Sequence, residues 1–137
     1  RKVIAHKISP RASTQLITST FKAAFAERNP SSDLLIFHSD QGVQFTSQRF
    51  RGLLRTQGIR QSFSRKACPY DNGVIESFNS SIKTEEIHRI SYRSEAEFRR
   101  RINESITFYN TKRIHGEIGY RTPEKKEQDY QKSCSVQ

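Results

Sequence analysis

The chain has no tryptophan and no methionine, and only 33% of its 137 residues are hydrophobic. No stretch approaches the roughly 18 consecutive apolar residues of a transmembrane helix, and no charged-then-apolar leader of a signal peptide is visible. Nine phenylalanines and five tyrosines supply bulk for a core. We expect one domain, or part of one, that needs a partner or a further segment to cover its apolar faces.

Cysteine is also scarce. The only two, Cys68 and Cys134, are far apart and form no CxxC motif. This spacing argues against a disulfide framework and against a zinc site. Two free thiols in a reducing interior are the expected state.

Acidic residues are missing from two long segments, residues 1–26 and 41–70. The formal net charge is +10, and the second segment alone carries six cations. Such a balance favours a polyanion partner, most simply a nucleic acid, although a solvated basic surface is the alternative. The six cations are Arg49, Arg51, Arg55, Arg60, Arg65 and Lys66.

Periodicity and turn residues predict an α/β chain. A short strand over 2–8 is expected before a helix over 13–28, and the apolar run 34–37 favours a central parallel strand buried on both faces. Thr46 is the expected N-cap of a helix that Gly58 closes. The remaining expectations are a half-buried strand over 59–63, a loop over 64–72, and helices over 73–88 and from the Ser94/Glu97 capping box to Tyr109. After Asn110 we expect irregular structure, and over 124–137 a frayed charged tail.

Asp40 lies just past the apolar run, where α/β proteins place ligands outside the carboxyl ends of strands. It is therefore a candidate metal ligand. The alternative is a turn aspartate that bonds its own backbone ahead of Gly42.

The expected helix over 73–88 places its apolar stripe, Ile75, Phe78 and Ile82, toward the core. Glu76 and Lys83 are seven residues apart and stand together on another face. They are either a solvated ion pair or a carboxylate aimed into a site with a lysine aimed at a phosphate.

Several motifs together resemble the catalytic core of bacterial insertion-sequence transposases, in the retroviral-integrase superfamily. The resemblance covers about residues 1–123, and 35 residues separate Asp40 from Glu76, as in the last two catalytic carboxylates of that family. The motifs are HSDQGVQF from His38, LLRTQGI from Leu53, SRKACPYDNGVIESFNSSIKTE from Ser64 and YNTKRIHGEIGYRTP from Tyr109.

The resemblance implies an RNase H-like fold and a triad of two aspartates and a glutamate. Asp40 matches the second aspartate and Glu76 the glutamate, while the first belongs on a strand upstream of Arg1. The implied cofactor is Mg²⁺, with Mn²⁺ as a substitute, and the implied chemistry is end cleavage and strand transfer of a mobile element. The two carboxylates are then expected about 4–8 Å apart, close enough to share a divalent ion.

The resemblance extends to other positions. It implies DNA contacts from Lys83, Tyr70 and Asn72, to which we add Arg60, Arg65 and Lys66 from the basic segment. Asn79 is expected to support Glu76. His38 either supports a metal ligand through a hydrogen bond or is a histidine at a strand end whose hydrogen bonds are structural only.

We therefore expect the partial catalytic core of a transposase over residues 1–123, inactive by itself, with a charged tail over 124–137. Its implied partners are DNA and further copies of the chain, in the bacterial cytoplasm at the nucleoid and without a membrane. Two alternatives remain. One is a DNA-binding or interaction module derived from such an enzyme; the other is a nuclease acting on RNA–DNA hybrids, which the YNTKRIHGEIGYRTP segment disfavours.

Overall fold

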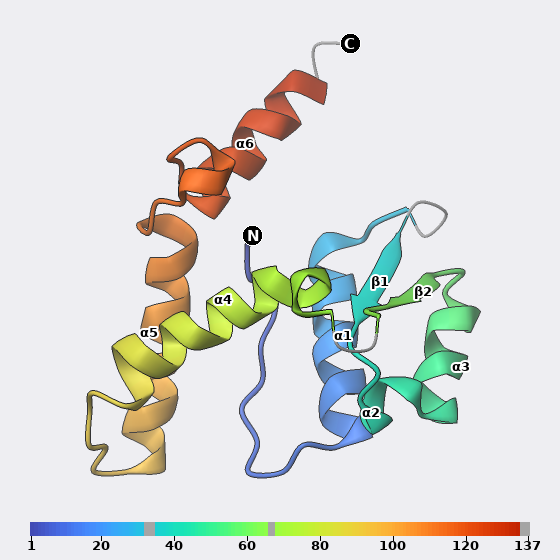
Figure 1. Ribbon diagram of the computed structural model, residues 1–137, viewed down its shortest axis with the longest axis horizontal. Helices are drawn as coiled ribbons and strands as arrows, with labels where there is room; N and C mark the ends of the chain where they lie inside the picture. The colour runs from blue at the N-terminus through green and yellow to red at the C-terminus, as the bar shows by residue number, and fades with distance from the viewer. Residues whose placement is uncertain (32–34, 66–67, 135–137) are drawn as a thin grey trace. The chain divides into compact units, whose positions relative to one another are not determined.

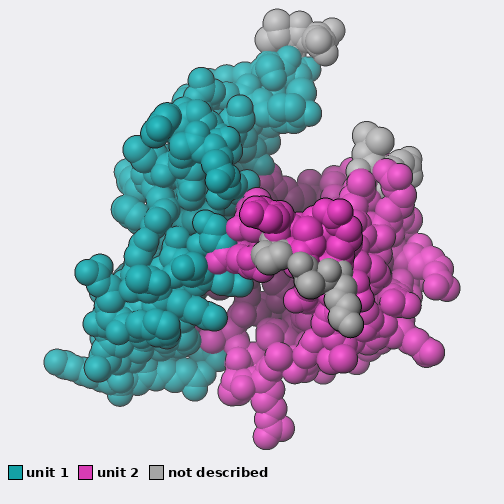
Figure 2. Space-filling model, in the orientation of Figure 1, with its two compact units in different colours: residues 1–3, 77–137 teal, residues 4–76 magenta. Residues whose placement is uncertain are grey.

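A computed structural model describes residues 1–31, 35–65 and 68–134. They form two compact units, one of residues 4–76 and the other of residues 1–3 and 77–137 (Figure 2). The boundary falls inside helix α4 (Gly73–Ile82). No helix in the described ranges is both long and apolar enough to cross a bilayer.

The unit of residues 4–76 is built around two parallel strands, β1 (Ile36–Ser39) and β2 (Arg60–Phe63) (Figure 1). The register pairs Ile36 with Arg60 and Ser39 with Phe63. Three helices accompany the strands: α1 (Thr14–Arg28), α2 (Val43–Thr46) and α3 (Gln48–Thr56). A 3₁₀ turn, η2 (Pro69–Asn72), leads into α4.

Side chains at the helix ends fix where α1 and α3 begin. The hydroxyl of Ser13 accepts the N–H of Leu16 at 3.1 Å, and Asn29 ends α1 in the left-handed conformation, as expected for a helix over 13–28. The predicted cap at Thr46 is wrong by one residue, because Thr46 ends the short helix α2 and Ser47 caps α3 instead. Capping of this kind satisfies backbone N–H groups that have no partner in the first turn.

Phenylalanines hold this unit together. Phe50 of α3 is fully buried, and its ring meets Phe37 of β1, Phe21 of α1 and Phe45 of α2 at centroid distances of 5.1–6.0 Å. Such edge-to-face contacts add to the stabilisation from apolar burial. The core therefore joins α1, α2 and α3 to the strand that precedes Asp40.

The expectation of a central strand over 34–37, buried on both faces, is corrected in two respects. The strand begins at Ile36, and Leu34 lies outside the described residues. Ile36 is 51% exposed and His38 is exposed, whereas Phe37 packs on the core and Ser39 is buried. The strand is buried on one face because the helices of this unit cover only the face that carries Phe37.

Residues 2–8 form no strand among the described residues, contrary to expectation. The N–H and C=O of Val3 instead pair with the side-chain amide of Asn110, each at 2.9 Å. These two bonds hold the backbone of Val3 without a strand ladder.

The second unit is helical. After α4 come the π-helix η3 (Lys83–Ile87), α5 (Glu95–Thr111), the 3₁₀ turn η4 (Gly116–Ile118) and α6 (Pro123–Cys134). The helix expected over 73–88 thus changes to π geometry at Lys83, and Ile75 of its predicted apolar stripe is 52% exposed.

The frayed tail expected from Glu124 is wrong for residues 124–134, because they belong to α6. Thr122 accepts the N–H of Lys125 at 3.2 Å, and Pro123 occupies the first helical position, where proline is favoured. Asp129 pairs with both Arg121 and Lys125. These local contacts support a helix, although the charge-rich composition of the segment had suggested a frayed tail.

α5 begins as predicted, with Ser94 accepting the N–H of Glu97 at 3.1 Å. Ile102, Ile106 and Tyr109 are buried on one face. The unit also buries the carboxylate of Glu86, which accepts hydrogen bonds from Arg101 at 2.8 Å and Ser105 at 3.0 Å. A buried charge requires such partners, and they tie η3 to α5.

Candidate active site

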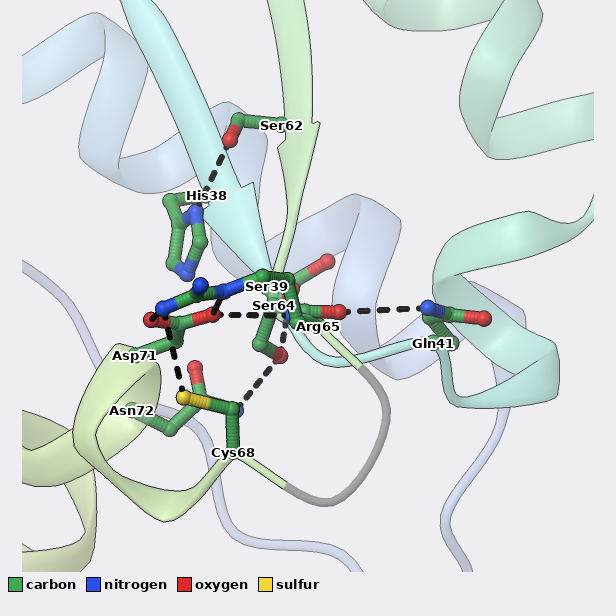
Figure 3. Close-up of polar contacts among 9 residues, drawn as sticks. All are labelled: His38, Ser39, Gln41, Ser62, Ser64, Arg65, Cys68, Asp71 and Asn72. Atoms are coloured by element: carbon green, nitrogen blue, oxygen red, sulfur yellow. Dashed lines mark hydrogen bonds and ion pairs between the residues drawn. The ribbon is translucent and has the colours of Figure 1, made fainter.

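The carboxyl ends of the two parallel strands lie at one edge of the sheet, and a polar network continues the pairing beyond them. Ser64, directly after β2, donates its backbone N–H to the carbonyl of Ser39 at 2.9 Å and its hydroxyl to the same oxygen at 3.3 Å. Gln41 donates to the carbonyl of Ser64 at 3.1 Å (Figure 3). Ser39 and Ser64 are buried, so the chain on either side of Asp40 is fixed.

Asp40 is exposed at this edge. Its Oδ1 accepts the N–H of Gly42 at 2.9 Å, which is the turn contact that sequence alone offered as the alternative to metal binding. Its second oxygen accepts no hydrogen bond from the described residues. The turn contact therefore orients the carboxylate and leaves one oxygen open to a ligand.

A glycine is required at position 42 because the Asp40 carboxylate lies too close to leave room for a side chain. A Cβ at this position would lie 2.9 Å from Oδ1 of Asp40. Any side chain there would displace the carboxylate, because a carbon and an oxygen cannot remain so close without movement.

The segment after β2 is fastened to the same edge. Asn72, the last residue before α4, donates its amide to the hydroxyl of Ser64 at 2.8 Å. Asp71 accepts three hydrogen bonds from Arg65, from the backbone N–H at 2.9 Å and from Nε and Nη2 at 3.2 Å each. The Arg65 side chain and backbone hold the pKa of the Asp71 carboxyl well below its usual range.

Glu76 lies in the first turn of α4 and is exposed. It makes no hydrogen bond or ion pair with the described residues. Asp40 and Glu76 belong to the same unit, and their separation of about 4–8 Å remains a prediction.

The oxygen atoms of the Asp40 and Glu76 carboxylates are chemically suited to bind a hard divalent cation. Asp40 and Glu76 present carboxylate oxygens, which Mg²⁺ prefers, and both are accessible. The described ranges contain no cluster of three or more Asp, Glu, His or Cys residues suited to a metal. Asp71 is already engaged by Arg65, as described above. The two carboxylates match the donor chemistry of a magnesium site, and their assignment as metal ligands stays a prediction.

The other predicted residues fall into different surroundings. Tyr70 is 94% exposed in η2, and Arg60 is exposed on β2. Lys83 and Asn79 are exposed and belong to the other unit. Lys66 lies outside the described residues.

Three of the predicted side chains bond within the protein. His38 bonds through Nδ1 to Ser62, its register partner on β2, at 3.0 Å. The side chains of Asn72 and Arg65 bond to Ser64 and Asp71. Sequence reasoning missed the roles of Ser39, Ser64 and the Arg65–Asp71 pair. The one signal in the sequence was the position of the two serines, since Ser39 ends β1 and Ser64 directly follows β2.

Two family models, both described as integrase core domain, match the chain, one over residues 1–69 and the other over residues 57–123. The overlapping matches together include Asp40, Glu76 and the network between them.

The chain is similar to curated transposases. It is 38% identical over 124 residues to the transposase for insertion sequence element IS904 of Lactococcus lactis subsp. lactis, covering 90% of this chain and 49% of that relative. It is 32% identical over 122 residues to the putative transposase InsK for insertion sequence element IS150 of Escherichia coli, covering 89% and 43%. The chain therefore spans about half the length of the curated relatives it matches.

Solved structures support the fold. The catalytic core domain of BIV integrase superposes with a TM-score of 0.63 at 21% identity, over 93% of this chain and 80% of that one. A chain of the simian T-cell lymphotropic virus intasome, in complex with PP2A regulatory subunit B56 gamma, gives 0.61 at 16% identity, over 78% and 37%. The predicted RNase H-like integrase core fold is confirmed.

Proposed function

Because this chain belongs to the integrase core domain family, we propose that it carries the last two catalytic carboxylates of an insertion-sequence transposase. The parent protein then cuts DNA at the ends of a mobile element and joins them to target DNA by phosphoryl transfer. One observation carries this proposal: Asp40 stands exposed at the carboxyl end of a parallel strand with one carboxylate oxygen open.

In the proposed site, Asp40 and Glu76 hold Mg²⁺, for which Mn²⁺ can substitute, together with an aspartate from an upstream strand. When bound, the metal neutralises charge on the scissile phosphate and sharpens the oxygen nucleophile. The chain's own contribution is to orient the two carboxylates. The Gly42 N–H fixes Asp40, and the start of α4 fixes Glu76.

The DNA-binding surface is proposed on α3 and β2. Arg49, Arg55 and Arg60 are exposed and have no carboxylate partner within the ranges that the structure describes. Arg51 lies over the ring of Phe63 at 5.7 Å from its centroid. Arg51 and Arg55 line a shallow hollow of about 350 Å³. Unpaired guanidinium groups are free to bind phosphates.

The cations of the other unit are arranged differently. Many of them are paired with acids of the same unit, so their charge is locally balanced. These pairs include Lys2 with Glu127, Arg100 with Glu104, Arg101 with Glu86, Arg113 with Glu85 and Arg121 with Asp129. The contrast favours α3 and β2 as the phosphate-binding surface, with Tyr70 and Lys83 as further proposed DNA contacts.

The proposed partners are the element ends, target DNA and further copies of the protein. A solved relative by fold is part of an intasome, which favours a multimeric active form. Because the substrate is DNA, the reaction is proposed to take place at the bacterial nucleoid.

The alternative is a DNA-binding module without activity. The described residues contain no cluster of three metal-binding side chains, and two carboxylates alone leave a metal under-coordinated. Paired cleavage and gel-shift assays on the full-length protein distinguish the two functions. Mg²⁺-dependent nicking at element ends supports the transposase, whereas DNA binding without nicking supports the module.

A further inference from the structure

The end of the segment between β2 and α4 is bonded at two points to the residues that directly follow β2, and both contacts lie close to the start of the helix that carries Glu76. Asn72 reaches Ser64, which in turn bonds to Ser39 beside Asp40. Asp71 accepts hydrogen bonds from both the backbone and the side chain of Arg65. We call these contacts, among Ser39, Ser64, Arg65, Asp71 and Asn72, the loop latch (Figure 3).

The two attachments differ in physical character. The Arg65 side chain is 79% exposed, and an exposed ion pair contributes little to global stability. The geometry of this pair is nevertheless specific, because the Asp71 carboxylate accepts two hydrogen bonds from the Arg65 guanidinium and a third from the Arg65 backbone N–H. The Asn72–Ser64–Ser39 path is half-buried to buried. The latch therefore fixes position more than it stabilises the fold.

Position matters here because Glu76 lies only four residues beyond Asn72. Its backbone is carried by a helix whose first residue, Gly73, follows the latch directly. Gly73 has open space around it, so no side chain at that residue holds the junction. The polar contacts before it must set where the helix begins.

We infer that Asp71 and Asn72 are positioning residues for the reaction: through Arg65 and Ser64 they hold the start of α4, and hence Glu76, to the strand end that bears Asp40. This inference rests on the proposed function. It also changes the role of Arg65, which serves the latch instead of a DNA phosphate.

Two properties separate a latch from a phosphate contact. In a latch, Arg65→Ala removes the two guanidinium hydrogen bonds to Asp71, and Asp71→Ala removes these and the bond from the Arg65 backbone N–H. The double variant is therefore no worse than Asp71→Ala alone, because both changes act on one contact. If Arg65 bound a phosphate, Arg65→Ala would weaken DNA binding and lower its salt dependence, whereas Asp71→Ala would not.

The experiment uses full-length protein carrying Arg65→Ala, Asp71→Ala, both together, or Asn72→Ala. Arg100→Ala and Glu104→Ala serve as matched controls, since they break an exposed arginine–carboxylate pair in the other unit. Cleavage of a duplex element end is measured across a Mg²⁺ titration. DNA affinity is measured on the same preparations.

The expected result is a cleavage rate reduced about tenfold or more in each latch variant, since small misplacement of a reacting group is costly. The half-saturating Mg²⁺ concentration rises, and DNA affinity stays within about twofold of the parent. A purely structural defect lowers the active fraction but leaves the Mg²⁺ midpoint unchanged. An unchanged midpoint, or a double variant with multiplied defects, overturns the inference.

Hydrogen–deuterium exchange tests the latch independently of activity. The N–H of Arg65 is donated to Asp71, so Asp71→Ala should accelerate exchange in the peptide that contains it, and Glu104→Ala should not. If the parent protein fails to cut DNA while exchange responds as expected, the proposed function fails and the latch stands. If the parent cuts DNA and exchange is unchanged, the latch fails and the function stands.

Discussion

The backbone N–H of Gly42 donates a hydrogen bond of 2.9 Å to Oδ1 of Asp40, and a Cβ on Gly42 would lie at the same distance from that oxygen. The smallest residue is thus needed to orient the carboxylate without crowding it. The requirement is steric, since the backbone angles of Gly42 (φ −54°, ψ 142°) are open to other residues.

Gly42→Ala should therefore fold and yet misplace the Asp40 carboxylate. We expect end cleavage by the full-length protein to fall by up to about 100-fold, the cost of misplacing a catalytic group by roughly 1 Å. The thermal midpoint should change little, because the crowded atom is the movable end of an exposed side chain. Gly52→Ala is the matched control, as a Cβ there meets no atom within 4 Å. Equal cleavage by both variants would contradict the role assigned to Gly42.

Asp40→Asn and Glu76→Gln should each abolish nicking and strand transfer in the full-length protein. Each replacement removes a negative oxygen ligand but keeps the size of the side chain, so DNA binding should remain close to that of the parent. Cleavage and gel-shift assays on the same preparations measure both properties. If Glu76→Gln cuts as well as the parent protein, the assignment based on its spacing from Asp40 is wrong.

Arg55→Gln combined with Arg60→Gln should weaken DNA binding and flatten its dependence on salt. Removing one cation that neutralises a phosphate should reduce the slope of log affinity against log salt by about 0.9 for duplex DNA. The decrease in affinity should be similar for unrelated sequences, since binding to phosphates carries no sequence information. Arg100→Gln, which removes a cation already paired with Glu104, should leave the slope unchanged.

Phe50→Ala should destabilise the unit of residues 4–76. Phe50 is 0% exposed at the centre of the aromatic cluster, and removing a buried ring of this size costs about 3–5 kcal/mol. Val43, which is 76% exposed, provides the control; its change to alanine should stay within about 0.5 kcal/mol. Chemical denaturation followed by circular dichroism measures both. A decrease in unfolding free energy below about 1 kcal/mol for Phe50→Ala would show that the cluster can collapse into the space.

Much of the local structure was determined by the sequence itself. The spacing of Ile17, Phe21 and Phe25 predicted α1, and the Ser94/Glu97 pair predicted the start of α5. The apolar run before His38 predicted a parallel strand shortly before Asp40, with an error of two residues at each end. These features depend on neighbours within a few residues, so a sequence contains them directly.

Only the tertiary structure decided how those elements use their polar residues. Whether residues 2–8 pair as a strand depends on a distant partner, and here the backbone of Val3 bonds to the side chain of Asn110 instead of to a strand. The burial of Glu86 depends on Arg101 and Ser105, which are 15 and 19 residues away. Arg65 counts as one more cation in the sequence, but in three dimensions its guanidinium meets Asp71. Charge and hydrogen-bonding capacity belong to single residues, whereas the partner that engages them is chosen by the fold.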